Sequence, residues 1–143
     1  MPDGDDLRVL VEDRQERPVD VEGLVELART VLRGEGVADA ELSLALVPED
    51  EIAALHERFL GEAGPTDVLA FPLDAADGDG TRLLGDVVIA PAYAARTRDD
   101  LAAELRLLLV HGILHLLGHD HEEDAERAAM WALQERYSGV AIP

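Results

Sequence analysis

The sequence predicts a single α+β domain in which a mixed sheet of about four strands is covered by helices. Its apolar patterns follow one another as strand, helix, strand, helix, strand, strand, helix and helix. The chain of 143 residues is long enough to bury one core, and its 48% hydrophobic and 30% charged composition is typical of a soluble globular protein. Because aromatic residues make up only 3% of the chain, we expect a core of Leu, Val, Ile and Ala.

Four segments have the apolar alternation or the short apolar run of a strand, bounded by turn residues. Pro72 is expected to close the third strand, because proline cannot donate a hydrogen bond to a strand ladder. The acidic, Gly-rich stretch 74–82 lacks the ligand spacing of an EF-hand and is expected to be a solvated turn. The strands are expected at 7–13 (LRVLVED), at 41–47 (ELSLALV), within 64–72 (GPTDVLAFP) and at 83–91 (LLGDVVIAP).

The helices are identified by apolar residues three and four apart and by residues that start or stop a helix. Gly34 and Gly36 end the first helix, and Pro48 with the acidic residues after it begins the second. The third helix is apolar nearly all round towards its end, which predicts a buried central helix that Gly118 terminates. The helices are expected at 19–36, 48–60, 99–117 and 123–137, with a helical turn at 91–96.

Composition excludes several kinds of site and location. Without Cys the chain has neither disulfides nor thiolate metal ligands, so any metal must bind to His and carboxylates. The N-terminus MPDGDDLR shows no signal peptide, and no apolar run is long enough to span a bilayer. We therefore expect a cytoplasmic protein with no membrane partner. The net charge of -19 argues against broad, nonspecific binding to phosphate groups.

Four of the five histidines lie in one stretch, HGILHLLGHDH, at 111–121. On a helix, residues four apart lie one turn above each other, so His111 and His115 point the same way. Both could bind one zinc ion through imidazole nitrogens, at about 2.0–2.1 Å. Buried histidines need partners for their polar nitrogens, and a metal ion supplies one. The stretch therefore predicts a metal site.

Two residues are candidates for a third ligand. If the helix continued, His119 would extend the face of His111 and His115. Gly118, however, is suited to the left-handed conformation that ends a helix, and a turn there favours His121, with His119 in reserve. The spacing is that of the metzincin pattern, H-E-x-x-H-x-x-G-x-x-H, so the central helix is expected to have metzincin-like geometry. Three histidine ligands to one zinc ion leave an open position, as in catalytic sites.

The second position of that pattern, where the metalloproteases carry the Glu that acts as general base, is Gly112. The site is therefore a poor candidate for a peptidase. No catalytic residue besides the metal ligands is identified. Asp120 and Asp86 are candidates for the proton acceptor, although Asp120 could equally orient a histidine ligand.

Three motifs resemble those of the YbeY family of bacterial endoribonucleases, also called ribosomal RNA maturation factors. HGILHLLGHDH resembles the signature HGxLHLxGYDH, GPTDVLAFP resembles PTDVLSFP, and LLGDVVIAP resembles an LGDIVIS-type strand. The resemblance implies one domain over 1–143 with zinc bound by His111, His115 and His121. It also implies cleavage of single-stranded RNA in the maturation of the 3′ end of small-subunit ribosomal RNA, and a role in ribosome quality control.

The chain departs from the family pattern at three positions: His119 replaces a Tyr, Ala70 replaces a Ser, and Leu60 stands where many members carry an Arg. Arg58 or Arg82 could replace that Arg at the phosphate. Because the chain is so acidic, we expect weak intrinsic affinity for RNA, with the ribosome or an assembly protein as a partner that directs the enzyme. Two alternatives stay open: a metal-dependent hydrolase of another substrate such as peptide, and a non-catalytic metal-containing ribosome-assembly factor.

Overall fold

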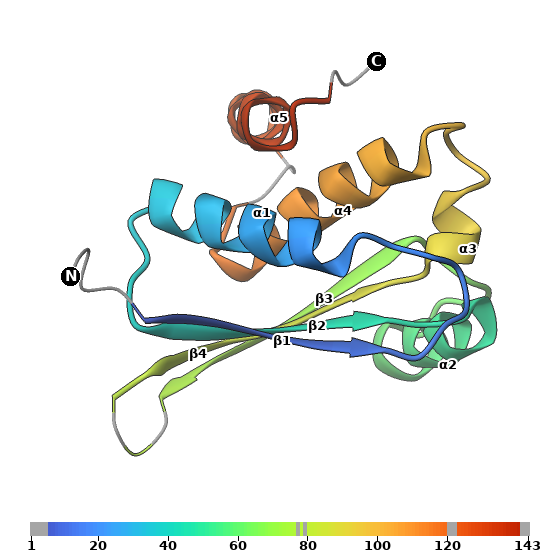
Figure 1. Ribbon diagram of the computed structural model, residues 1–143, viewed down its shortest axis with the longest axis horizontal. Helices are drawn as coiled ribbons and strands as arrows, with labels where there is room; N and C mark the ends of the chain where they lie inside the picture. Colours follow the sequence, from blue (N-terminus) through green and yellow to red (C-terminus); the bar gives the residue numbers. More distant parts are fainter. Residues whose placement is uncertain (1–5, 77, 79, 120–122, 141–143) are drawn as a thin grey trace.

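The computed structural model describes residues 6–76, 78, 80–119 and 123–140 (Figure 1). It confirms an α+β domain with a mixed sheet of four strands packed against helices. None of the described helices is long and apolar enough to cross a membrane. In chain order the elements are β1 (Leu7–Asp13), α1 (Val21–Gly34), β2 (Ala40–Leu46), α2 (Glu49–Leu60), β3 (Val68–Ala76), β4 (Arg82–Ile89), α3 (Pro91–Ala94), α4 (Leu101–Leu116) and α5 (Asp124–Ser138).

The strand order in the sheet is β1-β2-β4-β3. β1 runs parallel to β2, and β2 runs parallel to β4, whereas β3 and β4 form an antiparallel hairpin. Helix α1 makes the crossover between the parallel strands β1 and β2, as parallel pairing requires. β1 and β3 are the edge strands, and β2 and β4 are the central strands.

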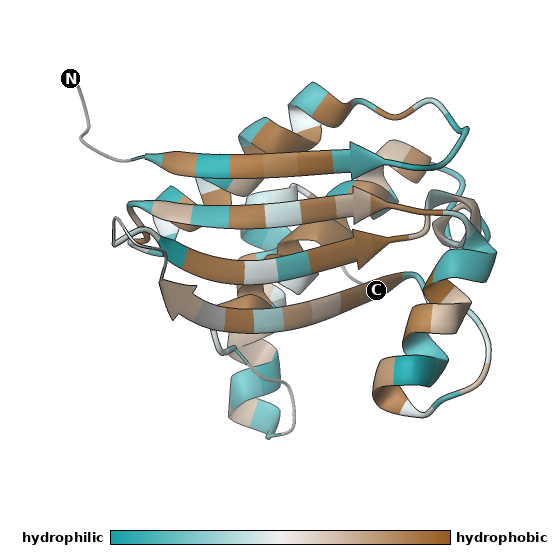
Figure 2. Ribbon diagram, turned by 90° about the horizontal axis from the view of Figure 1, so that it is seen from below, coloured by the Kyte–Doolittle hydropathy of each residue, from teal (hydrophilic) through white to brown (hydrophobic). Residues whose placement is uncertain are grey.

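Helices cover the two faces of the sheet unequally. α1 and α4 pack on one face, and α5 packs in turn against α4 and α1 (Figure 1). The opposite face is uncovered along much of its length, with α2 at one end (Figure 2). There Ile52 of α2 is buried in a small second cluster with Leu69 and Val88. The larger core, and with it the most buried helix, therefore lies on the face of α1 and α4.

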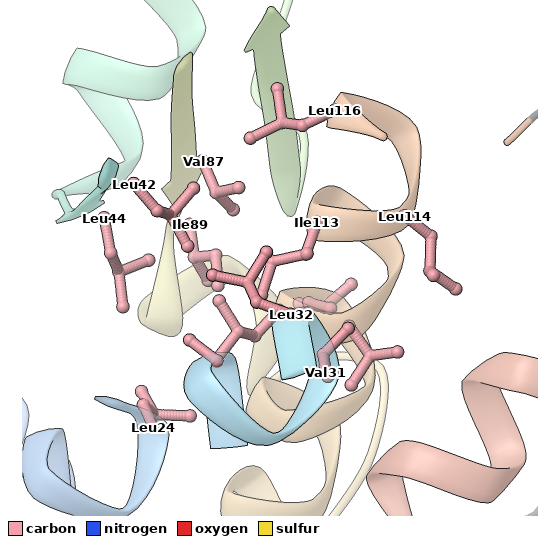
Figure 3. Packing of buried hydrophobic residues seen from close by; sticks show 14 of the residues in the cluster. Leu24, Val31, Leu32, Leu42, Leu44, Val87, Ile89, Ile113, Leu114 and Leu116 are labelled. Atoms are coloured by element: carbon pink, nitrogen blue, oxygen red, sulfur yellow. The ribbon is translucent and has the colours of Figure 1, made fainter. Parts of the chain in front are cut away.

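The core is built almost entirely from aliphatic side chains, as the composition predicts (Figure 3). Alternation along β2 places its leucines on the covered face, where Leu42 and Leu46 are fully buried. They face α1 and α4, and α4 is apolar nearly all round because it lies between the sheet and the helices α1 and α5. The residues labelled in the figure come from α1, β2, β4 and α4: Leu24, Val31, Leu32, Leu42, Leu44, Val87, Ile89, Ile113, Leu114 and Leu116.

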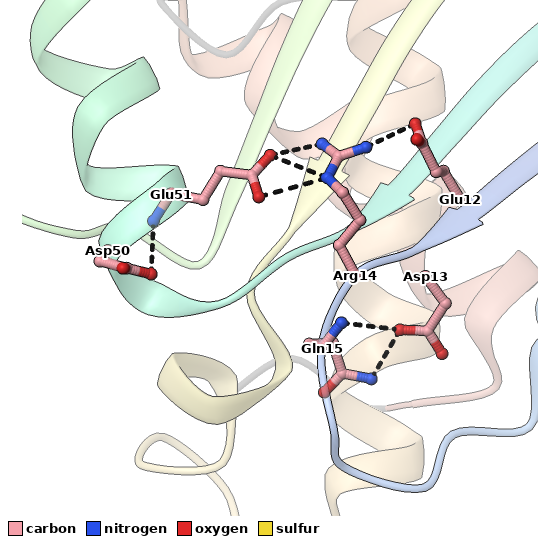
Figure 4. Close-up of polar contacts among 6 residues, drawn as sticks. All are labelled: Glu12, Asp13, Arg14, Gln15, Asp50 and Glu51. Atoms are coloured by element: carbon pink, nitrogen blue, oxygen red, sulfur yellow. Dashed lines mark hydrogen bonds and ion pairs between the residues drawn. The ribbon is translucent and has the colours of Figure 1, made fainter.

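Arg14, directly after β1, ties this strand to the start of α2 (Figure 4). Its Nε lies 3.1 and 3.2 Å from the two carboxylate oxygens of Glu51, and its guanidinium also pairs with Glu12. Hydrogen bonds to Glu51 and then to Glu12 hold the pKa of Arg14 above its ordinary value. The pairing fixes the end of α2 that lies beside the uncovered face of the sheet.

One sequence expectation about the strands is wrong. β3 does not close at Pro72 but continues to Ala76, so part of the stretch 74–82 is strand and not turn. β3 is an edge strand, with one side of its backbone unpaired, and an edge strand tolerates a residue without an N–H group. The pairing register with β4 shifts just after this proline. The other expected elements are all present, with bounds shifted by at most two residues.

Gly85 allows the two halves of the hairpin to approach closely. Its φ of 130° lies in a region that side chains other than glycine rarely adopt, and it pairs with Pro72 where the register shifts. A Cβ at this position would lie 2.2 Å from the carbonyl oxygen of Phe71 and 2.9 Å from the backbone nitrogen of Leu73. The glycine of the LLGDVVIAP motif is therefore required by the sheet itself.

Replacing Gly85 by Ala is expected to destabilise the protein by about 3 kcal/mol, because the collision is with backbone atoms and the backbone angle is unfavourable. Urea unfolding monitored by circular dichroism measures the change. Gly78→Ala, in the hairpin loop, is the matched control: a Cβ there meets nothing within 4 Å, so stability should change by less than about 0.5 kcal/mol. Equal stability of the two variants would contradict this account of Gly85.

Candidate metal centre

His111 and His115 lie side by side on the last two turns of α4. Their ring centroids are 4.6 Å apart and the rings are inclined at 73°. Both rings are half-buried and line a cavity of about 260 Å³ between α4 and β3, closed on one side by Leu60 at the end of α2. The expectation that the two imidazoles share one side of the helix is confirmed. The described lining residues are Leu60, Val68, Leu69, Ala70, Phe71, Pro72, His111, Gly112 and His115.

The ring of His111 is oriented by Gln134 of α5. The Nδ1 atom of His111 is in hydrogen-bond contact with the side-chain oxygen Oε1 of Gln134. An amide oxygen can only accept, so this hydrogen bond requires the tautomer with the proton on Nδ1, which in the neutral ring has its lone pair on Nε2. Sequence reasoning missed Gln134, and the only signal for it was a polar residue one turn after Met130 on the buried side of α5.

The end of α4 is fixed by its backbone. Gly118 has a φ of 95°, its N–H donates to the carbonyl of His115 at 3.0 Å, and the N–H of His119 donates to the carbonyl of Leu114 at 3.0 Å. These two bonds form a Schellman motif, so α4 ends at the turn that is expected at Gly118. The chain leaves helical register at this point. The expected third ligand, His121, and the neighbouring Asp120 lie outside the described residues.

His119, the reserve candidate, contacts a carboxylate. Its Nε2 lies 2.9 Å from Oε1 of Glu35, just after α1, and the hydroxyl of Tyr137 donates to Oε2 of the same carboxylate at 2.8 Å. Burial, and after it the hydrogen bond to Glu35, raises the pKa of Tyr137. This cluster of Glu35, His119 and Tyr137 connects α1, the segment after α4 and α5.

Gly112 lies where α4 packs directly against Val87 of β4. A Cβ on it would lie 2.7 Å from Cγ1 and 3.1 Å from Cγ2 of Val87 on β4. Val87 is fully buried, so its side chain has little room to move. The position that holds the general base in the protease pattern thus has no space for a Glu side chain in this fold. Packing against β4, as well as the missing carboxylate, separates this site from a peptidase.

The remaining candidate residues lie elsewhere. Asp86 is next to Val87 on β4, and because adjacent strand residues point to opposite faces, it faces away from α4. It lines a groove of about 710 Å³ on the other face of the sheet, together with Ser43 and Phe71. Asp86 is therefore not brought to the histidines.

Arg58 and Arg82, the candidates for binding the RNA phosphate, also lie outside the histidine cavity. The guanidinium of Arg58 lies 5.2 Å from the ring centroid of Phe59, and Arg82 is exposed at the start of β4. The described residues that line the histidine cavity include no Arg, and Leu60 occupies its edge, 55% exposed. Within the described ranges, no group of three or more His, Asp or Glu side chains is spaced to hold a metal ion.

Comparisons with known proteins give one consistent result. The family model described as Endoribonuclease YbeY matches residues 10–139. An Endoribonuclease YbeY of Acidothermus cellulolyticus is 49% identical over 146 residues, covering 87% of this chain and 86% of the relative. One of Salinispora tropica is 46% identical over 134 residues, covering 82% and 85%. The solution structure of TM1509 from Thermotoga maritima is similar with a TM-score of 0.57 and 33% identity, covering 92% of this chain and 86% of that one.

Gly112→Ala is expected to cost about 1–3 kcal/mol of stability, because the added methyl group meets the side chain of Val87. The gain in helix propensity, about 1 kcal/mol, offsets part of this cost, so we expect a net loss of up to about 2 kcal/mol. The check is a double-mutant cycle with Val87→Ala, in which removing the valine methyl groups should recover about 1 kcal/mol or more. Additive losses in the double variant would show that Val87 is not what excludes a side chain at this position.

Proposed function

Since the chain belongs to the YbeY endoribonuclease family, we propose that it is a zinc-dependent endoribonuclease that cleaves phosphodiester bonds in single-stranded regions of ribosomal RNA. The proposed role is maturation of the small-subunit RNA at its 3′ end, with a part in ribosome quality control, in the bacterial cytoplasm. The observation that carries the proposal is the pair of imidazoles, 4.6 Å apart, facing a cavity at the end of a buried helix.

His111, His115 and His121 would hold the zinc ion. The donor set fits, because the chain has no Cys and neutral imidazoles are common zinc ligands. His111 meets a further requirement, since its Nδ1 atom is engaged with Gln134 and a ligand histidine normally uses one nitrogen for the metal and the other for such a partner. The engagement of His119 with Glu35 supports His121 as the third ligand. Zinc bound there would supply Lewis-acid polarisation of a phosphate oxygen and a lowered pKa for water.

The chain's own residues shape the rest of the site. Aliphatic side chains of β3 and Leu60 line the cavity, which excludes water on the sides away from its opening. No described lining residue is an Arg, and the net charge is -19, so the protein alone offers RNA little attraction beyond a bound cation. We therefore propose that the ribosome or an assembly protein brings the enzyme to its RNA.

Metal content tests the ligand set. His111→Ala, His115→Ala and His121→Ala should each lose most of the bound zinc measured by mass spectrometry of the dialysed protein, whereas His119→Ala should keep it. His56→Ala is the matched control, since His56 lies on α2 and bonds the carbonyl of Gly64 at 3.0 Å, outside the cavity. Loss of zinc in His119→Ala with retention in His121→Ala would exchange the two assignments.

Cleavage assays test the reaction. Zinc-loaded protein should cut an unstructured RNA, and His115→Ala should be slower by about 100-fold or more, which corresponds to about 2.7 kcal/mol of transition-state stabilisation. Neither protein should degrade casein, because no Glu fits at Gly112. RNA left intact by the zinc-loaded wild type would contradict the proposed nuclease, and casein hydrolysis that depends on His115 would establish a peptidase instead.

A further inference from the structure

We propose that Gln134 is a positioning residue of the metal centre, which holds His111 in the tautomer and orientation that present Nε2 to the ion. The proposal rests on the proposed function insofar as His111 is taken as a ligand. It goes further in assigning a role to α5, a helix that contributes no residue to the lining of the histidine cavity.

Gln134 is a buried polar residue on a helix whose buried positions follow one stripe. Met130, Gln134 and Ser138 are four residues apart, and all three are at most 4% exposed. A Gln at the centre of such a stripe is uncommon, because a buried amide without a partner costs about 1–3 kcal/mol. His111 supplies the partner, from a residue 23 positions away in the sequence. The hydrogen bond therefore satisfies the buried amide and at the same time orients the imidazole.

Two contacts hold α5 in place about one turn after Gln134. Nε of Arg106 on α4 donates to the carbonyl of Ser138 at 3.1 Å, which fixes the end of α5. At the same end of α5, the hydroxyl of Tyr137 donates to the carboxylate of Glu35, which also contacts His119 beyond α4. Both connections lie about one turn after Gln134, so the part of α5 that carries this side chain is held beside His111. Such rigidity distinguishes a positioning contact from an incidental one.

The chemical consequence concerns the tautomer. A neutral imidazole can carry its proton on either nitrogen, and only the nitrogen without the proton can bind a metal ion. An acceptor at Nδ1 selects the form with the lone pair on Nε2 and increases the basicity of that nitrogen. Loss of such a partner typically weakens metal binding by about 10- to 100-fold.

The test measures tautomer and metal affinity without RNA. Long-range ¹H–¹⁵N NMR spectra of the metal-free protein should show the Nδ1–H form for His111 in the wild type and a mixture of tautomers in Gln134→Leu. Zinc affinity, measured by competition with a chelator, should fall by about 10- to 100-fold in Gln134→Leu. Gln134→Glu keeps an acceptor in the same place and should restore both readouts to within about threefold of the wild type, as carboxylate partners of zinc histidines do.

Ser138→Ala is the matched control for structural damage to α5. It removes a buried hydroxyl that bonds the carbonyl of Gln134 and the N–H of Val140, without touching His111. We expect its zinc affinity and its His111 tautomer to match the wild type, even where urea unfolding shows a similar loss of stability. Weakening of zinc binding in Ser138→Ala equal to that in Gln134→Leu would overturn the proposal in favour of a packing role.

An unchanged tautomer and unchanged affinity in Gln134→Leu would also overturn it, and would leave the proposed nuclease intact. A wild type that binds no zinc would overturn the proposed metal site together with this role of Gln134. Failure of RNA cleavage by a protein that binds zinc as described would affect the proposed reaction alone.

Discussion

The contact between Gly112 of α4 and Val87 of β4 is the constraint on which the rest of the site depends. It brings the helix so close to the sheet that a single added methyl group would collide, and so fixes both the height and the rotation of α4. With the rotation fixed, His111 and His115 must face the gap between the helix and β3. The same contact that positions the histidines leaves no space for the protease Glu. One packing interaction therefore bears on both where the histidines lie and which side chain can stand between them.

Burial of α4 places a second demand on the fold. A helix enclosed by the sheet, α1 and α5 must find a partner for each of its polar groups, and here the partners come from distant parts of the chain. Gln134 meets His111, and Glu35 meets His119. The helix end is satisfied locally by the turn at Gly118. The outer helices thus act as a support that orients the imidazoles, while the sheet supplies the opposite wall of the cavity.

The sequence predicts the features that depend on neighbouring residues and misses those that depend on residues far apart in the chain. Periodicity identifies the strands and helices, and a left-handed glycine identifies the end of α4, because these depend on neighbouring residues. Pro72 gave a wrong expectation for the end of β3, because a proline is tolerated within a strand that lies at the edge of the sheet. The pair of Glu35 and His119 is 84 residues apart, and no local pattern connects them. The orientation of Asp86 could have been predicted from the sequence. Adjacent residues of a strand point to opposite faces, so Asp86 and the apolar Val87 cannot both face α4. The choice of His121 as third ligand stays a prediction.

The charge of the protein bears on how the site could attract RNA. Where the resemblance to the YbeY family leads one to expect an Arg, Leu60 lies at the edge of the cavity, and no described lining residue replaces the missing cation. A net charge of -19 disfavours the approach of an RNA backbone. Any attraction must then be concentrated where a divalent ion would bind, between His111 and His115. In the proposed function, affinity confined to one point would not select a sequence, so the partner that holds the RNA would select the cleavage site. In the proposed function, the acidic charge would limit indiscriminate cutting of RNA, and it is the reason for proposing that an assembly partner brings the enzyme to its substrate.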